Sequence, residues 1–541
     1  MSKAMHLDIQ THRKNPVGVL RRSYREDGKV KKETLGRITG VSLEQLRLIQ
    51  ASLQGKTMMT DDFTITHSRE YGASHTLIQL VKSIGLDKVI YSRPSEDWVK
   101  LVIGMIVGRI LYKGSKLSLT RLSAFSSLWS QLGVEHLAQN VNELYSAMDQ
   151  LHQRQKAIQK KLAKKHIQQG HLLLYDITSS YLVGDYSDSD LVHFGYNRDK
   201  KRGFEQIVIG LMCDQEGCPI GVKVFRGNTS DQSTVEEQLY TMTKQYGMKN
   251  LTFIGDRGMI QPDSIESFVS LQDEQISLSS VTALTHANIR KLCEEHQLTN
   301  KDHKQFPKAL TFHAFPGKRV ILYYNPKRAE EDSQTRQILI EKTEQLLSEI
   351  RLRKRSVTDA QLGIRVGKVI NRYKVGKFIE PTIKDGKLNW SLKKYLLERE
   401  AQYDGLYAVI TDVSVDDMSA DDVVQNYKRL SKVEQAFRVL KSSLLELRPI
   451  YHRTDDRIGS HVFLCMLSYY VHWHMSQRLA PLWKENKSGQ EWRYTMDSLI
   501  ENLKAIQENE VEVRGVTAKH INKPNKEQQR LMDLLLTLEK K

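Results

Sequence analysis

The chain has 541 residues, 40% of them hydrophobic and 27% charged, which is the composition of a folded protein with several cores. Its 81 Lys and Arg exceed its 64 Asp and Glu and leave a net charge of +17, which suits a surface that follows a phosphate backbone, although a basic protein without a polyanionic partner would have the same balance. The four cysteines (Cys213, Cys218, Cys293 and Cys465) lack CxxC spacing and predict reduced core residues rather than a zinc site, and no apolar stretch is long enough to span a bilayer, so we expect a cytoplasmic protein.

The first 168 residues divide into two predicted parts. Residues 18–38 predict two short strands around a Glu-Asp-Gly turn, followed by a helix capped by Ser42. From about 74 to 168, apolar residues recur at spacings of three and four beside basic faces, ending in RQKAIQKKLAKKH. This pattern predicts a helical module that could bind DNA, and a solvated charged helix explains the basic run equally well.

Strand character begins after residue 170. The runs HLLLYDITSSYLVG, FEQIVIGLMC and PIGVKVFRG predict three strands, the last two joined by an Asp-Gln-Glu-Gly turn. A helix follows, with Ser233 and Glu236 at capping-box spacing, and then LTFIGD, a short helix at about 261–270 and QISLSSVTAL. The order strand, strand, strand, helix, strand, helix, strand predicts an open mixed sheet with helices packed on it.

Residues 286–405 interrupt this rhythm. They contain the strand RVILYYN, a long charged helix at about 327–353 and further strands punctuated by Gly and Lys. The stretch LYAVITDV then returns to strand character, and a helix containing residues 427–441 follows it. The block at 286–405 is therefore predicted to be an insertion.

Two aspartates occupy positions where a sheet would present them together. Asp176 lies inside the first apolar strand, and Asp256 ends the fourth, between Gly255 and Gly258. Each alone is better explained by capping of the next turn or helix, but an acid in an apolar strand is costly unless it is paired or binds a metal. Because the first and fourth strands of such a sheet can be neighbours, we expect the two carboxylates to converge.

A third acid lies on the helix at 427–441. At 100° per residue, Tyr427, Arg438 and Lys441 fall within about 40° of Glu434, beside an apolar stripe that would face the core. The alternative is a surface pair between Glu434 and Arg438, which would contribute only ~0.3–0.5 kcal/mol. That pair would not explain the tyrosine and the lysine on the same line.

Three converging carboxylates have the chemistry of a two-metal site. Magnesium prefers hard oxygen ligands, and two ions roughly 3.5–4 Å apart can activate a water or 3′-hydroxyl and stabilise the leaving oxygen at phosphorus. Cations on the same helix face would hold the scissile strand. The sequence therefore predicts phosphoryl transfer on a polynucleotide.

These residues resemble a known family. The motifs YDITSSY around Asp176, GNTSD at 227–231, FIGDRGM around Asp256, and Tyr427, Glu434 and Lys441 at the spacing Y-x2-R-x3-E-x6-K resemble the DDE transposases of bacterial insertion sequences, of the IS-four type. The continuation LLELRPIYHRTDDRIGSHVFLCML is similar to the sixteen-thirty-four-like branch. The arginine of the signature falls on Leu430; Arg429 would point about 100° away from that line, whereas Arg438 could supply the charge.

The resemblance implies a mixed α/β fold: an RNase H-like five-stranded mixed sheet with helices, interrupted by a strand-rich insertion domain, with helical N- and C-terminal regions. The domains expected on this basis are an N-terminal β-hairpin and helix (1–60), a helical DNA-binding domain (61–168), an RNase H-like catalytic domain (169–285 and 406–450), an insertion domain (286–405) and a C-terminal helical region (451–541).

The resemblance also implies a function. Asp176, Asp256 and Glu434 would be the catalytic metal ligands, with Mg2+ as the cofactor and Mn2+ as a substitute, and Tyr427, Lys441 and Arg438 would contact DNA. The partners would be double-stranded DNA, as terminal inverted repeats and as target, and a second copy of the chain in a homodimer on the DNA. The protein would be bacterial and nucleoid-associated. It would cleave the ends of an insertion sequence and join the 3′-hydroxyl to target DNA.

Two other functions stay open from the sequence. An RNase H-like nuclease or a resolvase of the Holliday-junction type would share the acids, and a DNA-binding protein derived from a transposase would need none of them. Three minor features have simpler explanations. The histidines near HWH are expected to pack in a core, Asp185, Asp188 and Asp190 to lie in a solvated loop, and Asp231 to cap a helix.

Overall fold

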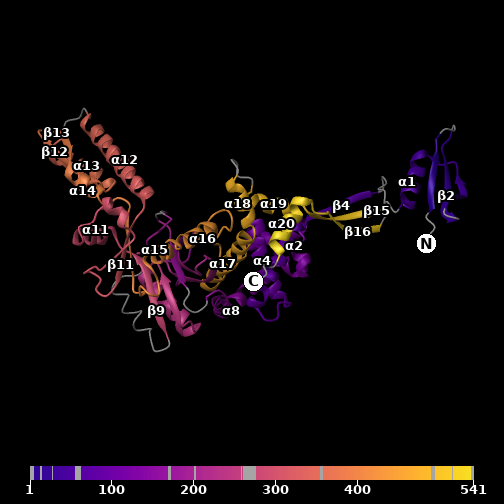
Figure 1. The fold of residues 1–541 in the computed structure, drawn as a ribbon, viewed down its shortest axis with the longest axis horizontal. Coiled ribbons are helices and arrows are strands. Elements are labelled where there is room, and N and C mark those ends of the chain that lie inside the picture. Colours follow the sequence, from indigo (N-terminus) through magenta and orange to yellow (C-terminus); the bar gives the residue numbers. More distant parts are fainter. Residues whose placement is uncertain are drawn as a thin grey trace. The chain divides into compact units, whose positions relative to one another are not determined.

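The structure is a computed structural model. It describes the whole chain except residues 1–4, 12–14, 27–28, 55–62, 168–171, 200, 202, 258, 260–275, 354–356, 489–493, 514–515 and 538–541. The chain forms two compact units (Figure 1). The first combines Met1–Gly72 with Lys504–Asn525, and the second combines Ala73–Leu503 with Lys526–Lys541.

The first unit contains two small antiparallel sheets and one helix. The predicted hairpin is present as β2 and β3, and β1 adds a third strand beside β2. The capping box at the start of the helix is formed by Ser42 and Gln45. The second sheet has the order β16-β15-β4. The elements are β1 (Met5–Gln10), β2 (Val17–Glu26), β3 (Lys29–Ile38), α1 (Leu43–Leu53), β4 (Phe63–Glu70), β15 (Gln507–Val513) and β16 (Val516–Ile521).

The terminal regions are not wholly helical, which corrects the expectation from the sequence. The segment FTITHSRE forms β4, and QENEVEV and VTAKHI form β15 and β16. The β-branched residues in FTIT, VEV and VT favour strands, but none of the three segments shows a sustained alternation of apolar and polar residues. The paired strands β4 and β15 are also far apart in the sequence.

The second unit begins with a helical module, as predicted. The helix α4 is buried along almost its whole length, and α8 packs against it and against α17. The helices are α2 (Gly72–Ser83), α3 (Leu86–Ile90), α4 (Asp97–Tyr112), α5 (Lys116–Leu119), η1 (Leu122–Ala124), α6 (Leu128–Leu132), α7 (Glu135–Ala138) and α8 (Val141–His166).

A mixed eight-stranded sheet forms the centre of this unit. Its order is β10-β11-β14-β9-β8-β5-β6-β7, with β5, β8 and β9 parallel and every other pair antiparallel. The strands are β5 (Leu172–Tyr181), β6 (Gln206–Cys213), β7 (Pro219–Arg226), β8 (Asn250–Ile254), β9 (Ser277–Ala283), β10 (Lys308–Leu310), β11 (Arg319–Tyr324) and β14 (Leu406–Thr411).

The sheet is larger than the five strands expected from the sequence. The five predicted strands β5 to β9 are present, and β14, β11 and β10 extend the sheet beyond β9. The reason is that RVILYY and LYAVIT are apolar and largely buried, so they pair with each other and with β9 and do not stand apart in a separate sheet. The helix predicted at about 261–270 lies outside the described residues.

Several helices and a small hairpin complete the second unit. Helices α12 and α13 and the strands β12 and β13 share a hydrophobic core of their own. The elements are α9 (Asp231–Tyr240), a π-helical turn η2 (Thr241–Gln245), α11 (His286–Glu295), η3 (Asn300–Gln305), α12 (Pro326–Arg351), α13 (Asp359–Arg372), η4 (Gly376–Phe378), β12 (Ile379–Lys384), β13 (Lys387–Leu392), α14 (Lys394–Ala401), α15 (Ala420–Lys428), α16 (Ser431–Lys441), α17 (Asp455–Arg478), α18 (Ala480–Ser488), α19 (Met496–Lys504) and α20 (Lys526–Leu536).

The single helix predicted across residues 427–441 is two helices. Between α15 and α16, the amide of Leu430 donates to the carbonyl of Tyr427 and the amide of Val433 donates to the carbonyl of Leu430, at 3.0 and 2.9 Å. Such bonds between residues three apart tighten the turn. The buried side chain of Leu430 lies at this junction, so angles counted at 100° per residue do not carry over from Tyr427 to Glu434.

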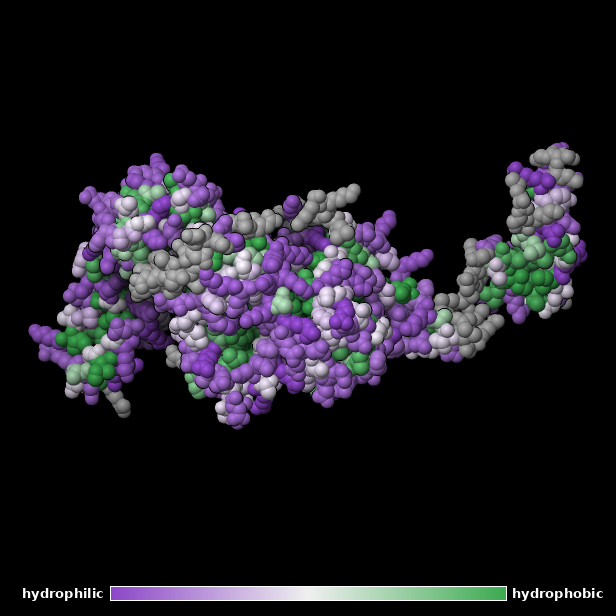
Figure 2. Space-filling model, turned by 90° about the horizontal axis from the view of Figure 1, so that it is seen from below, coloured by the Kyte–Doolittle hydropathy of each residue, from purple (hydrophilic) through white to green (hydrophobic). Residues whose placement is uncertain are grey.

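Hydrophilic residues cover most of the described surface on the face shown in Figure 2, and hydrophobic residues gather in separate areas. Within the described part of the chain, no helix combines the length and apolar character needed to cross a bilayer.

Candidate functional site

Asp176 lies on β5, a central strand of the large sheet. It is partly buried, and the Ile177 amide donates a hydrogen bond of 2.8 Å to its Oδ1. The pKa of Asp176 is raised to about 7, mainly by burial and also by the negative charges of Asp256 and Glu434, against the opposing effects of that hydrogen bond and of Arg198. The charges of the other two predicted acids therefore reach Asp176.

Asp256 follows the neighbouring parallel strand at the same level. Leu174 pairs with Ile254, so Asp176 and Asp256 each come two residues after a paired position of β5 and β8. The side chain of Asp256 is exposed, and its Oδ1 accepts a bond of 2.7 Å from the Arg257 amide. The parallel pairing thus places the two aspartates at the same level of neighbouring strands.

Tyr427 adjoins Asp256 from α15. Its hydroxyl donates to Asp256 Oδ1 at 3.4 Å, a long bond. Burial, followed by the charge of Asp256, raises the pKa of Tyr427 well above its usual range. The phenol therefore stays protonated and can orient the carboxylate.

Glu434 lies on the exposed side of α16, whose buried residues Val433, Phe437 and Leu440 pack toward the sheet and α17. Glu434 and Arg438 form no ion pair with each other or with any other residue that the structure describes. The surface pair considered as an alternative is therefore not formed. The glutamate instead contributes its charge to the environment of Asp176.

Lys441 is engaged inside the fold. Its Nζ donates to Thr178 Oγ1 and the Ser179 carbonyl, both at 2.6 Å, and to Asp199 Oδ1 at 2.9 Å. Arg448 binds the other oxygen of Asp199 at 2.6 Å. Because Thr178 and Ser179 follow Asp176 on β5, Lys441 fixes the strand that carries the first acid.

Neither residue at the helix junction supplies an arginine to the acids. Leu430 is 6% exposed, and Arg429 binds Glu216 and the Gln215 carbonyl at 2.8 and 3.2 Å. Lys432 binds the same glutamate at 2.8 Å. Arg438 is exposed on the same helix as Glu434, so it is the cation of this segment that can reach a ligand.

Sequence reasoning did not identify Arg198. Its guanidinium contacts Asp231 and its charge lowers the pKa of Asp176. Asp231 is the first residue of α9, and the cap is Ser230, whose Oγ accepts from the Ser233 amide at 3.4 Å, so the cap lies one residue earlier than expected. Asp231 is the last residue of the motif GNTSD, but nothing in the sequence predicts its contact with a loop residue such as Arg198.

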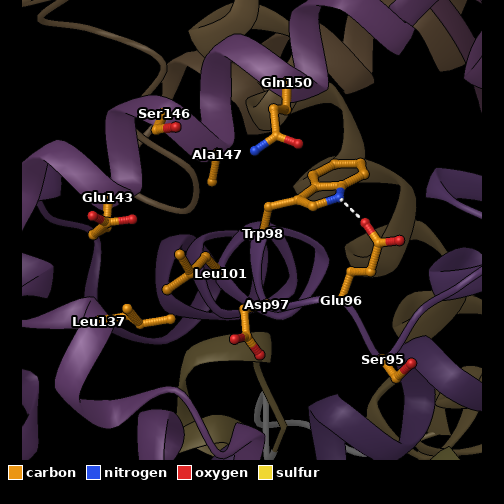
Figure 3. A pocket seen from close by; sticks show the side chains of 10 residues that line it. All are labelled: Ser95, Glu96, Asp97, Trp98, Leu101, Leu137, Glu143, Ser146, Ala147 and Gln150. Atoms are coloured by element: carbon orange, nitrogen blue, oxygen red, sulfur yellow. Dashed lines mark hydrogen bonds between the residues drawn. The ribbon is translucent and has the colours of Figure 1, made fainter.

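The other noted residues lie apart from the acids. Ser189 and the Asp190 amide bind Asp455, and Asp188 is exposed. All four cysteines are free and buried. A pocket of about 460 Å³ between α4 and α8 is lined by Trp98, whose indole donates to Glu96 at 2.9 Å (Figure 3). None of the predicted site residues lines that pocket.

The acids fit divalent cations by their chemistry. They provide hard oxygen donors, and the pKa of Asp176 is raised mainly by burial and also by the two neighbouring negative charges, which bound cations would offset. Among the described residues, these acids do not form a group whose ligand atoms all lie within 4.8 Å of one another. Ligation by all three would therefore require two ions or a movement of one of the acids toward the others.

Comparison with known families adds an independent observation. A family model described as a transposase DDE domain matches residues 176–471, which is more than half of the chain. The matched segment begins at Asp176 and includes Asp256, Tyr427, Glu434 and Lys441. A search of curated proteins found no match.

Proposed function

The chain belongs to the DDE transposase family, and from this premise we propose that it cleaves the ends of an insertion sequence and joins the 3′-hydroxyl to target DNA. The observation that carries the proposal is the placement of Asp176 and Asp256 at the same level of the parallel pair β5 and β8, with the charges of Asp256 and Glu434 both acting on Asp176. The resemblance of the motifs supports our further proposal that the chain is of the IS-four type and its sixteen-thirty-four-like branch.

The catalytic core is proposed to be RNase H-like. The consecutive strands β7, β6, β5, β8 and β9, of which the last three are parallel, support this assignment. They provide the five-stranded mixed sheet that the resemblance implies. The strands β14, β11 and β10 would then be an extension of this core toward the proposed insertion at 286–405.

We assign the metal site to Asp176, Asp256 and Glu434. Two Mg2+ ions, or Mn2+ in their place, would activate the attacking oxygen and stabilise the leaving oxygen of an in-line displacement at phosphorus. Tyr427 would orient Asp256, and Lys441 would keep β5 in position through Thr178 and Ser179.

DNA would approach the same edge of the sheet. Arg438, exposed one turn from Glu434, would contact a backbone phosphate, and Tyr427 would contribute a further contact. A DNA contact by Lys441 would require it to exchange Asp199 for a phosphate. The proposed partners are the terminal inverted repeats, the target duplex and a second copy of the chain, bound together at the nucleoid.

The test uses isosteric variants of the acids. Asp176→Asn, Asp256→Asn and Glu434→Gln are each expected to lower cleavage of the inverted repeats that flank the gene by about 10³-fold or more in Mg2+, since each removes a charged metal ligand. Binding of the same ends should stay within about threefold. Products are mapped at nucleotide resolution, with Asp188→Asn, in an exposed loop, as the matched control.

Three results would each reject part of the proposal. Cleavage by Glu434→Gln at the wild-type rate would remove that residue from the site. Cleaved ends without strand-transfer product would favour a nuclease. Binding of the ends without any cleavage by the wild-type chain would favour a non-catalytic DNA-binding protein.

A further inference from the structure

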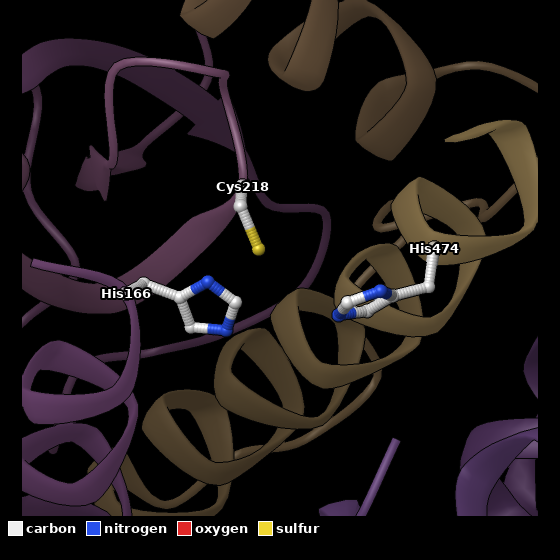
Figure 4. A group of neighbouring side chains, drawn as sticks. All are labelled: His166, Cys218 and His474. Atoms are coloured by element: carbon white, nitrogen blue, oxygen red, sulfur yellow. The ribbon is translucent and has the colours of Figure 1, made fainter. Parts of the chain in front are cut away.

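We propose that His166, Cys218 and His474 form a second metal site, a structural one for Zn2+. His166 ends α8, Cys218 precedes β7 and His474 lies on α17, and one ligand atom from each lies within 4.8 Å of the others. Figure 4 shows the two imidazoles and the thiol facing a common point. Among the described residues, no other group of His, Cys, Asp and Glu meets this criterion.

The donor set selects the kind of metal. A thiolate and two imidazoles are soft or borderline ligands, which suit zinc and do not suit Mg2+ or Ca2+. Zinc ligand atoms lie about 2.0–2.3 Å from the ion and hence about 3.5 Å from one another. Because no pair of these ligand atoms is more than 4.8 Å apart, the cluster would need to contract by at most about 1.3 Å, which rotation of the side chains can supply.

The carboxylate of Asp214 lies beside His166 and is a candidate fourth ligand. Asp214 is 8% exposed, and its Oδ2 lies 3.6 Å from His166 Nδ1. Its other oxygen accepts the amides of Glu216 and Cys218, both at 2.9 Å, so the carboxylate is already oriented. Asp214 does not belong to the group whose ligand atoms all lie within 4.8 Å of one another, so its carboxylate would have to turn toward the ion to complete the four ligands of a closed tetrahedral zinc centre.

Each of the two histidines has a ring nitrogen that could bind a metal. Nε2 of His474 is buried and has no hydrogen-bond partner among the described residues, an arrangement that costs free energy unless the nitrogen is satisfied. His166 bonds Tyr470 through Nε2 at 2.9 Å, which leaves Nδ1 for the metal.

The simpler explanation is a packed core. Edge-on contacts of His474 with Tyr470 and Trp473, whose ring centroids lie 4.6 and 4.9 Å away, are compatible with it. Packing does not account for an orphaned imidazole nitrogen, a buried thiol and a buried carboxylate in one place. The site could not be predicted from the sequence because its ligands come from three distant segments and form no short ligand motif.

The site would connect the metal to the helix of Glu434. Cys218 closes a turn whose Glu216 is bound by Arg429 and Lys432 at the start of α16. The indole of Trp473, next to His474, donates to the Glu216 carbonyl at 3.3 Å. A zinc ion would thus fix α8, the turn and α17 together at the point where α16 begins.

The test measures metal in the intact chain without DNA. Wild-type protein purified in the presence of Zn2+ is expected to retain one equivalent of zinc through gel filtration. The Co2+-loaded protein should show thiolate-to-cobalt charge-transfer absorption and the intense visible bands of tetrahedral cobalt. Cys218→Ala and His474→Ala should each lose the zinc equivalent, whereas Cys293→Ala, a buried cysteine in another core cluster, should retain it.

The proposal is overturned if the folded wild-type chain retains no stoichiometric zinc and shows no charge-transfer band with cobalt. It is also overturned if Cys218→Ala keeps both. If a variant fails to fold, the wild-type cobalt spectrum decides. The outcome is independent of strand cleavage. A chain that does not transpose could still bind zinc, and a chain that transposes could lack the zinc site.

Discussion

The pKa of Asp176 depends on burial and on the charges around it. In the folded chain, burial and two neighbouring acids raise its pKa from 3.8 to about 7. Between these values the folded state binds more protons than the unfolded state, so the stability of the metal-free protein falls as pH rises through this window. Above about pH 7 the carboxylate is ionised in both states, and the free energy of unfolding is lowered by the full cost of burying its charge.

Asp176→Asn is accordingly expected to stabilise the metal-free protein. In the presence of a chelator, its advantage in the free energy of unfolding should grow between pH 5 and pH 8 by about 2–3 kcal/mol as an upper estimate. Urea denaturation at the two pH values measures this growth. Asp188→Asn should show no such trend, and an equal lack of trend in Asp176→Asn would mean that the carboxyl is not destabilised.

At this scale the sequence predicted the acids but not their neighbours. An apolar run around Asp176 and the apolar strand before Asp256 are visible in one dimension. A helical face specifies the direction in which Lys441 points, but not what lies there, and the pairing with Asp199 depends on a loop. For the same reason Arg198 could not be connected with Asp176.

Among the elements, α4 is fixed by close packing. A Cβ atom added to Gly104 would lie 2.0 Å from Cζ3 of Trp129, which anchors α6. By contrast, a Cβ at Gly367 in α13 would meet nothing within 4 Å. Gly104 is needed for the close approach of Trp129, whereas the packing around Gly367 does not require a glycine.

Substituting each glycine by alanine should have opposite effects. Gly104→Ala is expected to destabilise the protein by about 1–3 kcal/mol because Trp129 must move. Gly367→Ala should stabilise it by up to about 1 kcal/mol because it raises helix propensity in open space. Thermal unfolding of the two variants measures the signs, and an unchanged midpoint for Gly104→Ala would contradict the packing of α4 on α6.

Element types were predictable where the periodic pattern was long. The strands β5 to β9 and the helix α12 follow from apolar runs and from a charged 3.6-residue pattern. Two errors have physical causes. The junction at Leu430 replaces a regular helix by a tight turn, and β4 and β15 are each recognisable only beside the other.

For the whole molecule, the net charge of +17 bears on the proposed binding of DNA. With a net charge of +17, the chain is expected to bind its end sequences with a strong salt dependence, because neutralised phosphates release condensed counterions. If 6–10 phosphates are contacted, affinity should fall about 10³- to 10⁵-fold between 50 and 200 mM salt. Fluorescence anisotropy over that range measures the slope, and a flat profile would contradict a phosphate-following surface. Arg438→Ala should reduce the slope by about one ion.

The pairing of β4 with β15 has a consequence for the time at which the protein is finished. Arg69 on β4 and its ion-pair partner Glu508 on β15 are 439 residues apart. A ribosome adding about 5–20 residues per second takes roughly 20–90 s to cover that distance. During this interval β4 is without its partner strand, so this sheet can form only after β15 has left the ribosome.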